Sequence, residues 1–168
     1  MKIVGEDLEE VVSRRLRGHG NVVVCGVGND LRADDGVGLL VAECLEGSVP
    51  GDVSVIRCGE VPENFIGEIV SRNPTHLIII DAAHVSQPPG TIVIVEADDI
   101  SPDTLSTHRL PLSFFASVVS QMRGGDVDVF TLAVQIRSTG FGEEMSPEVV
   151  RAANALCKAL RRALGRTG

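Results

Sequence analysis

Three aspartates and one histidine occupy positions at which this chain could hold a reactive site. Asp34 and Asp35 close a glycine-rich loop, residues 26–36, that follows a short β-branched run. Asp81 comes directly after the most apolar stretch of the chain, and His108 precedes an apolar segment expected to be helical. Two carboxylates and an imidazole on separate loops can bind a divalent cation and leave positions open for water or substrate. Asp35, Asp81 and His108 are therefore the candidate metal ligands and catalytic residues.

The acidic residues also have ordinary structural explanations. Aspartates at a helix entrance cap free backbone N–H groups, so we expect at least one of Asp34 and Asp35 to do so. Asp81 could instead bind backbone amides of its own loop. Gln135, at the end of the last expected strand, could line the same cleft.

The remaining candidates are weaker. His84 shortly follows Asp81, whereas His19 and His76 lie at the opposite ends of their elements and are not expected to take part. Glu63 and Asn64 stand at the start of an expected helix, where capping is the simplest role for both.

The glycine-rich loop does not match a phosphate-binding site. Gly26 and Gly28 follow a strand, but Leu31 stands where a dinucleotide fingerprint needs its third small residue. No Gly-Lys-Ser/Thr follows, and acidic side chains at the helix entrance would repel phosphate. Nor is a serine nucleophile indicated, since the chain has no Gly-x-Ser-x-Gly elbow. The loop is better suited to a cation.

Strands and helices alternate along the chain and must position these residues. Strands are expected at 21–25, 53–57, 76–81, 91–96 and 127–136, and helices at 6–17, 37–45, 62–71, 111–122 and 147–164. This order predicts a single α/β domain over residues 1–168, with three α/β/α layers and a mostly parallel, twisted sheet of about five strands. Ligands of such folds collect beyond the carboxyl ends of the strands. We expect the loops at 26–36, 81–90 and 97–111 to lie there.

Composition and charge exclude several kinds of partner. Hydrophobic residues make up 43% of the 168 residues and aromatic residues only 3%, so aliphatic side chains must build the core. The net charge of −8 repels nucleic acid and anionic membranes. No apolar stretch approaches the roughly 20 residues of a membrane span, and the first residues do not resemble a signal peptide. We expect a monomeric, cytoplasmic protein that binds neither nucleic acid nor membrane.

The four cysteines are widely spaced and form no CxxC pair: Cys25, Cys44, Cys58 and Cys157. Three of them fall within apolar segments, where a thiol behaves as a small hydrophobic side chain. We therefore expect four reduced, structural cysteines.

Five motifs in this chain resemble, in order, those of the [NiFe]-hydrogenase maturation endopeptidases. They are VCGVGN at 24–29, DDGVG at 34–38, PEN at 62–64, IDA at 80–82 and THRLPL at 107–112. The similarity runs from about residue 21 to residue 155, and the two glycine-containing blocks are its most specific part. The last motif looks most like the branch that processes hydrogenase 3-type large subunits.

The resemblance implies both a site and an activity. An acidic residue of the first loop, an aspartate after the central strand and a histidine of a later loop contact the metal in that family, and these roles fall on Asp35, Asp81 and His108. The implied enzyme is an endopeptidase of aspartic or metal-dependent type that removes the C-terminal extension of a hydrogenase large-subunit precursor after nickel insertion. Ni²⁺ would be supplied by the precursor, and the protease would be metal-free at rest.

Two other functions remain open. The chain could be a non-catalytic, nickel-dependent assembly or accessory protein with the same fold, or a nucleotide-binding α/β domain. Cleavage of nickel-loaded precursor separates the first alternative from a protease. Thermal stabilisation by NAD or ATP would indicate the second.

Overall fold

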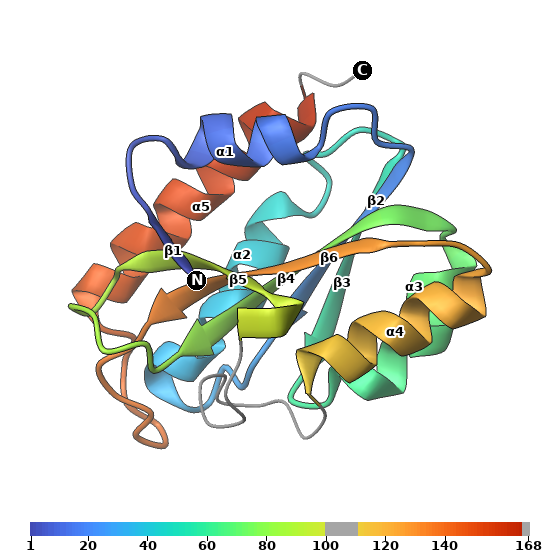
Figure 1. Cartoon of the computed structure of the whole chain (residues 1–168). Coiled ribbons are helices and arrows are strands. Elements are labelled where there is room, and N and C mark those ends of the chain that lie inside the picture. Colours follow the sequence, from blue (N-terminus) through green and yellow to red (C-terminus); the bar gives the residue numbers. More distant parts are fainter. Residues whose placement is uncertain (100–110, 166–168) are drawn as a thin grey trace.

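Six strands form one sheet that separates two layers of helices (Figure 1). The computed structural model describes residues 1–99 and 111–165. Its strands are β1 (Lys2–Val4), β2 (Asn21–Val27), β3 (Val53–Gly59), β4 (Pro74–Ala83), β5 (Ile92–Glu96) and β6 (Asp128–Gln135). Its α-helices are α1 (Leu8–Arg15), α2 (Val37–Leu45), α3 (Ile66–Ser71), α4 (Leu112–Arg123) and α5 (Pro147–Gly165). Short 3-10 segments cover Ala33–Gly36, Pro62–Phe65 and Ala97–Asp99.

The strand order is β1-β5-β6-β4-β2-β3. Strand β2 pairs in parallel with β3 and β4, and β4 pairs in parallel with β6, whereas both pairings of β5 are antiparallel. The predicted three-layer α/β fold with a mostly parallel sheet is therefore confirmed. The additional strand is β1, which has three residues and only one buried side chain, Val4, too few to produce a periodic pattern.

Strand β5 precedes the loop at 97–111, which was expected at the carboxyl ends of the parallel strands. Residues 100–110 of that loop lie outside the described part of the chain, so its position stays a prediction. Strand β5 itself runs antiparallel to β6 and ends toward the opposite side of the sheet. The reason lies in the connection from β4, residues 84–91, which is shorter than the dozen or more residues that a parallel crossover needs.

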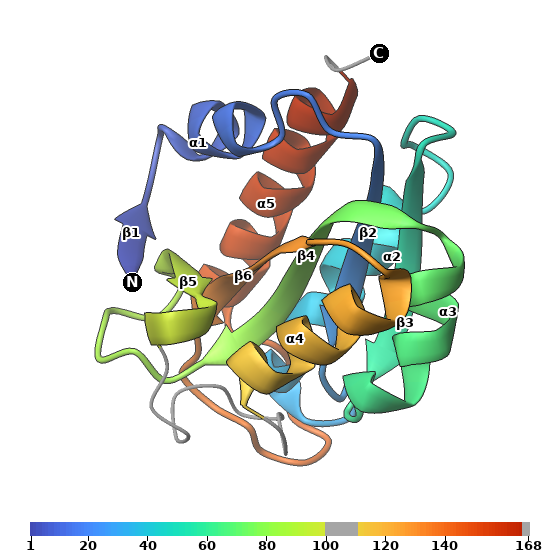
Figure 2. The same cartoon turned by 45° about the vertical axis from the view of Figure 1, so that its right-hand side comes forward.

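The helices bury both faces of the sheet. Helices α1, α2 and α5 cover one face and α3 and α4 the other (Figures 1 and 2). Side chains alternate between the faces, so Ile78 and Ile80 of β4 pack on the α1/α2/α5 side while Leu77 and Ile79 pack on the α3/α4 side. By this alternation Asp81 continues the α3/α4 face. No helix in the described ranges is long and apolar enough to cross a membrane.

Helix α2 begins in direct backbone contact with the ends of two strands. A Cβ atom at Gly38 would overlap the carbonyl oxygens of Val27 in β2 and Ile80 in β4. A Cβ atom at Gly26 would meet the carbonyl oxygen of Gly38. The glycines of the two sequence blocks therefore allow the start of α2 to lie against β2 and β4.

The expectation of reduced cysteines was wrong, because the structure joins all four in disulfides, Cys25–Cys58 and Cys44–Cys157. The first connects the neighbouring strands β2 and β3, with Cα atoms 6.1 Å apart. The second connects α2 and α5, with Cα atoms 6.3 Å apart. Both separations lie within the usual disulfide range. The register of β2 and β3 and the packing of α2 on α5 bring these cysteines together. The spacing of the cysteines in the sequence does not reveal such contacts.

Removing the disulfide between α2 and α5 should lower the unfolding temperature. Cys44 and Cys157 are 113 residues apart, and cross-linking a loop of that length stabilises by about 5 kcal/mol in the chain-entropy estimate. A Cys44→Ser/Cys157→Ser variant should therefore melt of the order of 10 °C lower in calorimetry without reductant. Equal melting temperatures, together with four reactive thiols in the denatured, unreduced wild type, would show that the bonds do not form.

Candidate active site

Asp81 is positioned at the carboxyl end of the sheet by a strand that is buried on both faces. Its side chain is fully buried, and it lies opposite Ala133 of β6 in the parallel ladder. The backbone N–H of Ala82 donates a hydrogen bond to Asp81 Oδ1 at 2.8 Å. Such a contact with a local amide is the structural role expected for Asp81 if it does not react. Burial on a central strand also gives Asp81 the rigid placement that a reacting carboxylate needs.

Asp35 lies in the β2–α2 turn, residues 28–36, and is held by its own backbone. Its N–H donates to the carbonyl of Arg32 at 3.0 Å, and its carbonyl accepts the N–H of Asn29 at 3.2 Å. Gly28 has a φ of +141°, and a Cβ atom there would overlap the Asp35 carbonyl oxygen. Ala33 has a φ of 49°, a left-handed conformation that costs a non-glycine residue about 1 kcal/mol or more. The turn fixes Asp35, which is only 5% exposed.

The neighbouring Asp34 has a structural role. Its Oδ2 accepts the N–H groups of Arg137 and Ser138 at 2.8 and 3.0 Å and the hydroxyl of Ser146 at 2.9 Å. Its Oδ1 accepts the N–H of Ser146 at 2.6 Å. The carboxylate thus ties the β2–α2 turn to the β6–α5 loop, residues 136–146.

Asp34 and Asp35 depart from two expectations. Neither the 3-10 segment Ala33–Gly36 nor α2 has a side-chain cap at its N-terminus, so the predicted capping role was wrong. Asp34 was also expected to face a cation in the cleft, but its oxygens accept four hydrogen bonds from protein groups instead. Burial raises the pKa of Asp34, and the bonds from Ser146, Ser138 and Arg137 outweigh that effect and hold the pKa below its usual range.

The elements that carry Asp35 and Asp81 touch each other. The 3-10 segment Ala33–Gly36 packs against β4, and Gly38 approaches the carbonyl of Ile80, the residue before Asp81. Two buried carboxylates are therefore brought to the carboxyl end of the sheet by elements in contact.

His108, the third predicted ligand, falls within residues 100–110, which lie outside the described part of the chain. Across residues 1–99 and 111–165, no three His, Cys, Asp or Glu side chains are grouped as around a metal ion. The set of Asp35, Asp81 and His108 therefore stays a prediction.

Two further polar residues do not have the roles expected of them. Gln135 does not present its amide to a cleft, because Oε1 accepts the N–H of Val85 at 2.7 Å and Nε2 donates to the carbonyl of Ile136 at 2.8 Å. Glu63 does not cap a helix, since the segments beginning near it have no side-chain caps. Instead, both carboxylate oxygens of Glu63 are buried. Glu63 follows the parallel strand β3, so the sequence already indicated a third acidic residue near this end of the sheet.

The other histidines lie where the sequence placed them. His84 is exposed and directly follows β4. His19 and His76 lie at the opposite end of the sheet, with ring centroids 6.4 Å apart. His76 Nε2 is 3.8 Å from Asp128 Oδ2, and burial, partly offset by Asp128, lowers the pKa of His76. These two residues belong to the surroundings of α1, away from the candidate site.

Comparison with known proteins identifies the family. A sequence model of the hydrogenase maturation protease family matches residues 39–163. The chain belongs to this family. The hydrogenase 3 maturation protease of Escherichia coli K12 is 35% identical to it over 130 residues, which cover 77% of this chain and 81% of that protein.

Solved structures of family members share the fold. The crystal structure of the [NiFe] hydrogenase maturation protease HycI from Thermococcus kodakarensis matches 92% of this chain and 99% of its own, with a TM-score of 0.83 and 34% identity. The solution structure of the endopeptidase HycI from Escherichia coli matches 88% of this chain and 92% of its own, with a TM-score of 0.72 and 32% identity. The glycines of this family member thus allow close packing of α2 on the sheet and do not form a nucleotide fingerprint.

The Asp34→Asn variant should be less stable by about 3 kcal/mol, because an amide nitrogen would face backbone donors that now bind a buried carboxylate. A lowered pKa stabilises the fold above the unfolded-state value near 4, and this stabilisation is lost as the pH falls through the folded-state pKa. Urea unfolding of wild type should show this acid-dependent loss, and the loss should be smaller in the variant, where other carboxylates with lowered pKa values such as Asp128 remain. The exposed Asp30→Asn provides the control. Equal stability of Asp34→Asn and wild type at pH 7 would contradict the structural role of Asp34.

Proposed function

We propose that this protein is the endopeptidase that removes the C-terminal extension of a [NiFe]-hydrogenase large-subunit precursor after nickel has been inserted. Membership of the protease family supports the general activity. The observation that carries the site assignment is the delivery of two buried carboxylates, Asp35 and Asp81, to one end of the sheet by elements in contact.

Nickel enters this proposal as cargo of the substrate. An ion already held by precursor thiolates can accept oxygen ligands from Asp35 and Asp81 and an imidazole nitrogen from His108. Such shared coordination would place the peptide bond to be cut beside the carboxylates. Precursor without nickel would lack this contact, so insertion of the metal would be checked before cleavage.

The proposed hydrolysis follows from the positions of the carboxylates. Nickel polarises the scissile carbonyl or activates a water, and one carboxylate accepts the proton of the attacking water. The water oxygen bonds to the carbonyl carbon, the C–N bond breaks, and the carboxylic acid returns the proton to the leaving amine. Because Asp35 is held by its turn and Asp81 by its strand, neither has to reorganise when charge develops.

Substitution of the proposed ligands should abolish cleavage while leaving the fold intact. Asp35→Asn, Asp81→Asn and His108→Ala each remove a group that contacts nickel or water, so each should reduce the rate by at least about a hundredfold. His76→Ala, at the opposite end of the sheet, is the matched control and should retain cleavage. The test is intact-mass analysis of nickel-loaded precursor, with circular dichroism to verify folding. Cleavage at the wild-type rate by Asp35→Asn and Asp81→Asn would exclude this site.

Precursor that lacks nickel should not be cut. In the same mass assay, nickel-loaded and nickel-free precursor are incubated with wild-type protein, and only the loaded form should lose its extension. Equal cleavage of both forms would contradict the role of nickel. Binding of loaded precursor without any cleavage would instead support a nickel-dependent assembly protein.

A further inference from the structure

An open groove adjoins the turn that carries Asp35. It has a volume of about 340 Å³ and lies between α2, β3 and the β6–α5 loop. Its lining residues are Asp30, Ala33, Gly36, Leu39, Leu40, Glu43, Arg57, Glu143, Glu144 and Met145. Because Ala33 and Gly36 flank the two aspartates of the β2–α2 turn, whatever enters this groove lies beside the turn that carries Asp35.

The groove combines an apolar base with a negatively charged rim. Leu39, Leu40 and Met145 are half-buried and supply apolar surface. The rim carries four exposed carboxylates: Asp30, Glu43, Glu143 and Glu144. Its one cation, Arg57, bonds to Glu46 outside the groove at 2.7 and 2.8 Å. The rim therefore keeps an excess of negative charge.

Two large apolar side chains are exposed on the loops beside the groove. Leu31 is 59% exposed and Phe141 is 74% exposed. The N–H of Gly142 donates to the carbonyl of Leu31 at 2.8 Å, so the two loop tips lie together. Exposed apolar side chains gathered near a pocket are typical of surfaces that bind another polypeptide.

We infer that this groove docks a basic, amphipathic stretch of the substrate polypeptide near its cleavage site. A lysine or arginine would lay its aliphatic stem on Leu39, Leu40 and Met145 and direct its charged head to the carboxylates. Adjacent apolar residues of the substrate would cover Leu31 and Phe141. This inference rests on the proposed function, which supplies the polypeptide, and it adds the chemistry by which that polypeptide is recognised.

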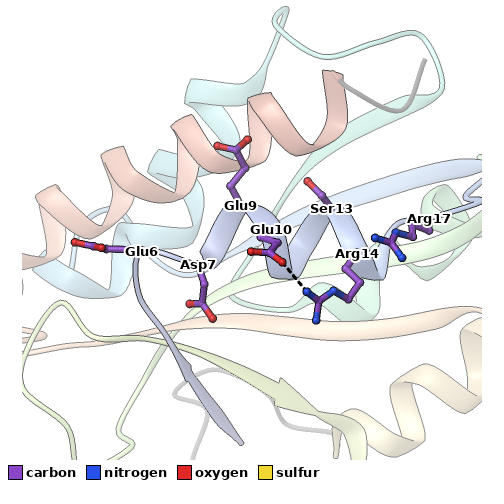
Figure 3. Close-up of a pocket in the computed structure, with 7 residues that line it drawn as sticks. All are labelled: Glu6, Asp7, Glu9, Glu10, Ser13, Arg14 and Arg17. Atoms are coloured by element: carbon purple, nitrogen blue, oxygen red, sulfur yellow. Dashed lines mark hydrogen bonds and ion pairs between the residues drawn. The ribbon is translucent and has the colours of Figure 1, made fainter.

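A second hollow of the molecule supplies a matched control. It lies along α1 and is lined by Glu6, Asp7, Glu9, Glu10, Ser13, Arg14 and Arg17 (Figure 3). It contains acidic residues but no apolar side chain, and Glu10 pairs with Arg14 at 2.6 Å. Charge reversal there changes the net charge of the protein equally without altering the groove.

The test compares Glu43→Lys/Glu144→Lys with Glu6→Lys/Glu10→Lys. The first probe is a fluorescent peptide of alternating lysine and leucine, read by anisotropy, beside the same peptide with glutamate in place of lysine. Wild type should bind the lysine peptide and not the glutamate peptide. The groove variant should bind the lysine peptide at least about tenfold more weakly, and the α1 variant should match wild type. Added salt should weaken binding to wild type.

Kinetics with nickel-loaded precursor separate this inference from the proposed function. The groove variant should raise KM by about tenfold and leave kcat within about twofold of wild type, because the groove binds substrate without touching the reacting atoms. Cleavage with an unchanged KM, or equal losses of peptide binding in both variants, would overturn the groove and leave the protease assignment intact. Absence of cleavage by wild type, with groove-dependent peptide binding retained, would overturn only the proposed function.

Discussion

The close backbone approach of α2 to the ends of β2 and β4 is the constraint on which the candidate site depends. Gly38 leaves room for the carbonyl oxygens of Val27 and Ile80 to touch the helix start, and Gly28 does the same for the carbonyl of Asp35. A side chain at these positions would push the turn away from the sheet. The elements that carry the two carboxylates would then lose their contact. The close backbone approaches at Gly28 and Gly38 therefore explain why the sequence has glycine there.

The two adjacent aspartates of the β2–α2 turn have different roles. The carboxylate of Asp34 accepts hydrogen bonds from Arg137, Ser138 and Ser146, and these bonds join the β2–α2 turn to the β6–α5 loop. That connection supports the strained backbone at Ala33 and leaves Asp35 as the residue proposed to act on substrate. The same two loops form one wall of the acidic groove. A single buried carboxylate thus supports both the proposed site and the proposed docking surface.

Much of the fold could be predicted because hydrophobic periodicity is local information. The helix at 37–45 was predicted with the bounds that the structure gives, and the buried strand that ends near Asp81 followed from its apolar run. The direction of β5 was missed, although the short connection at 84–91 contained the signal. The disulfides, the bonds of Asp34 and those of Gln135 depend on which distant segments meet. No local sequence pattern indicates such contacts. The position of His108 remains a prediction.

In the proposed mechanism, Asp35 and Asp81 become ligands of nickel delivered by the substrate. The most direct measurement is X-ray absorption at the nickel edge, comparing loaded precursor alone with its freeze-quenched complex with this protein. We expect nickel to gain oxygen and nitrogen ligands in the complex with wild type, and the gain in oxygen to be lost with Asp35→Ala/Asp81→Ala. Nickel coordination that is identical with and without the wild-type protein, in a complex that nevertheless proceeds to cleavage, would contradict this mechanism.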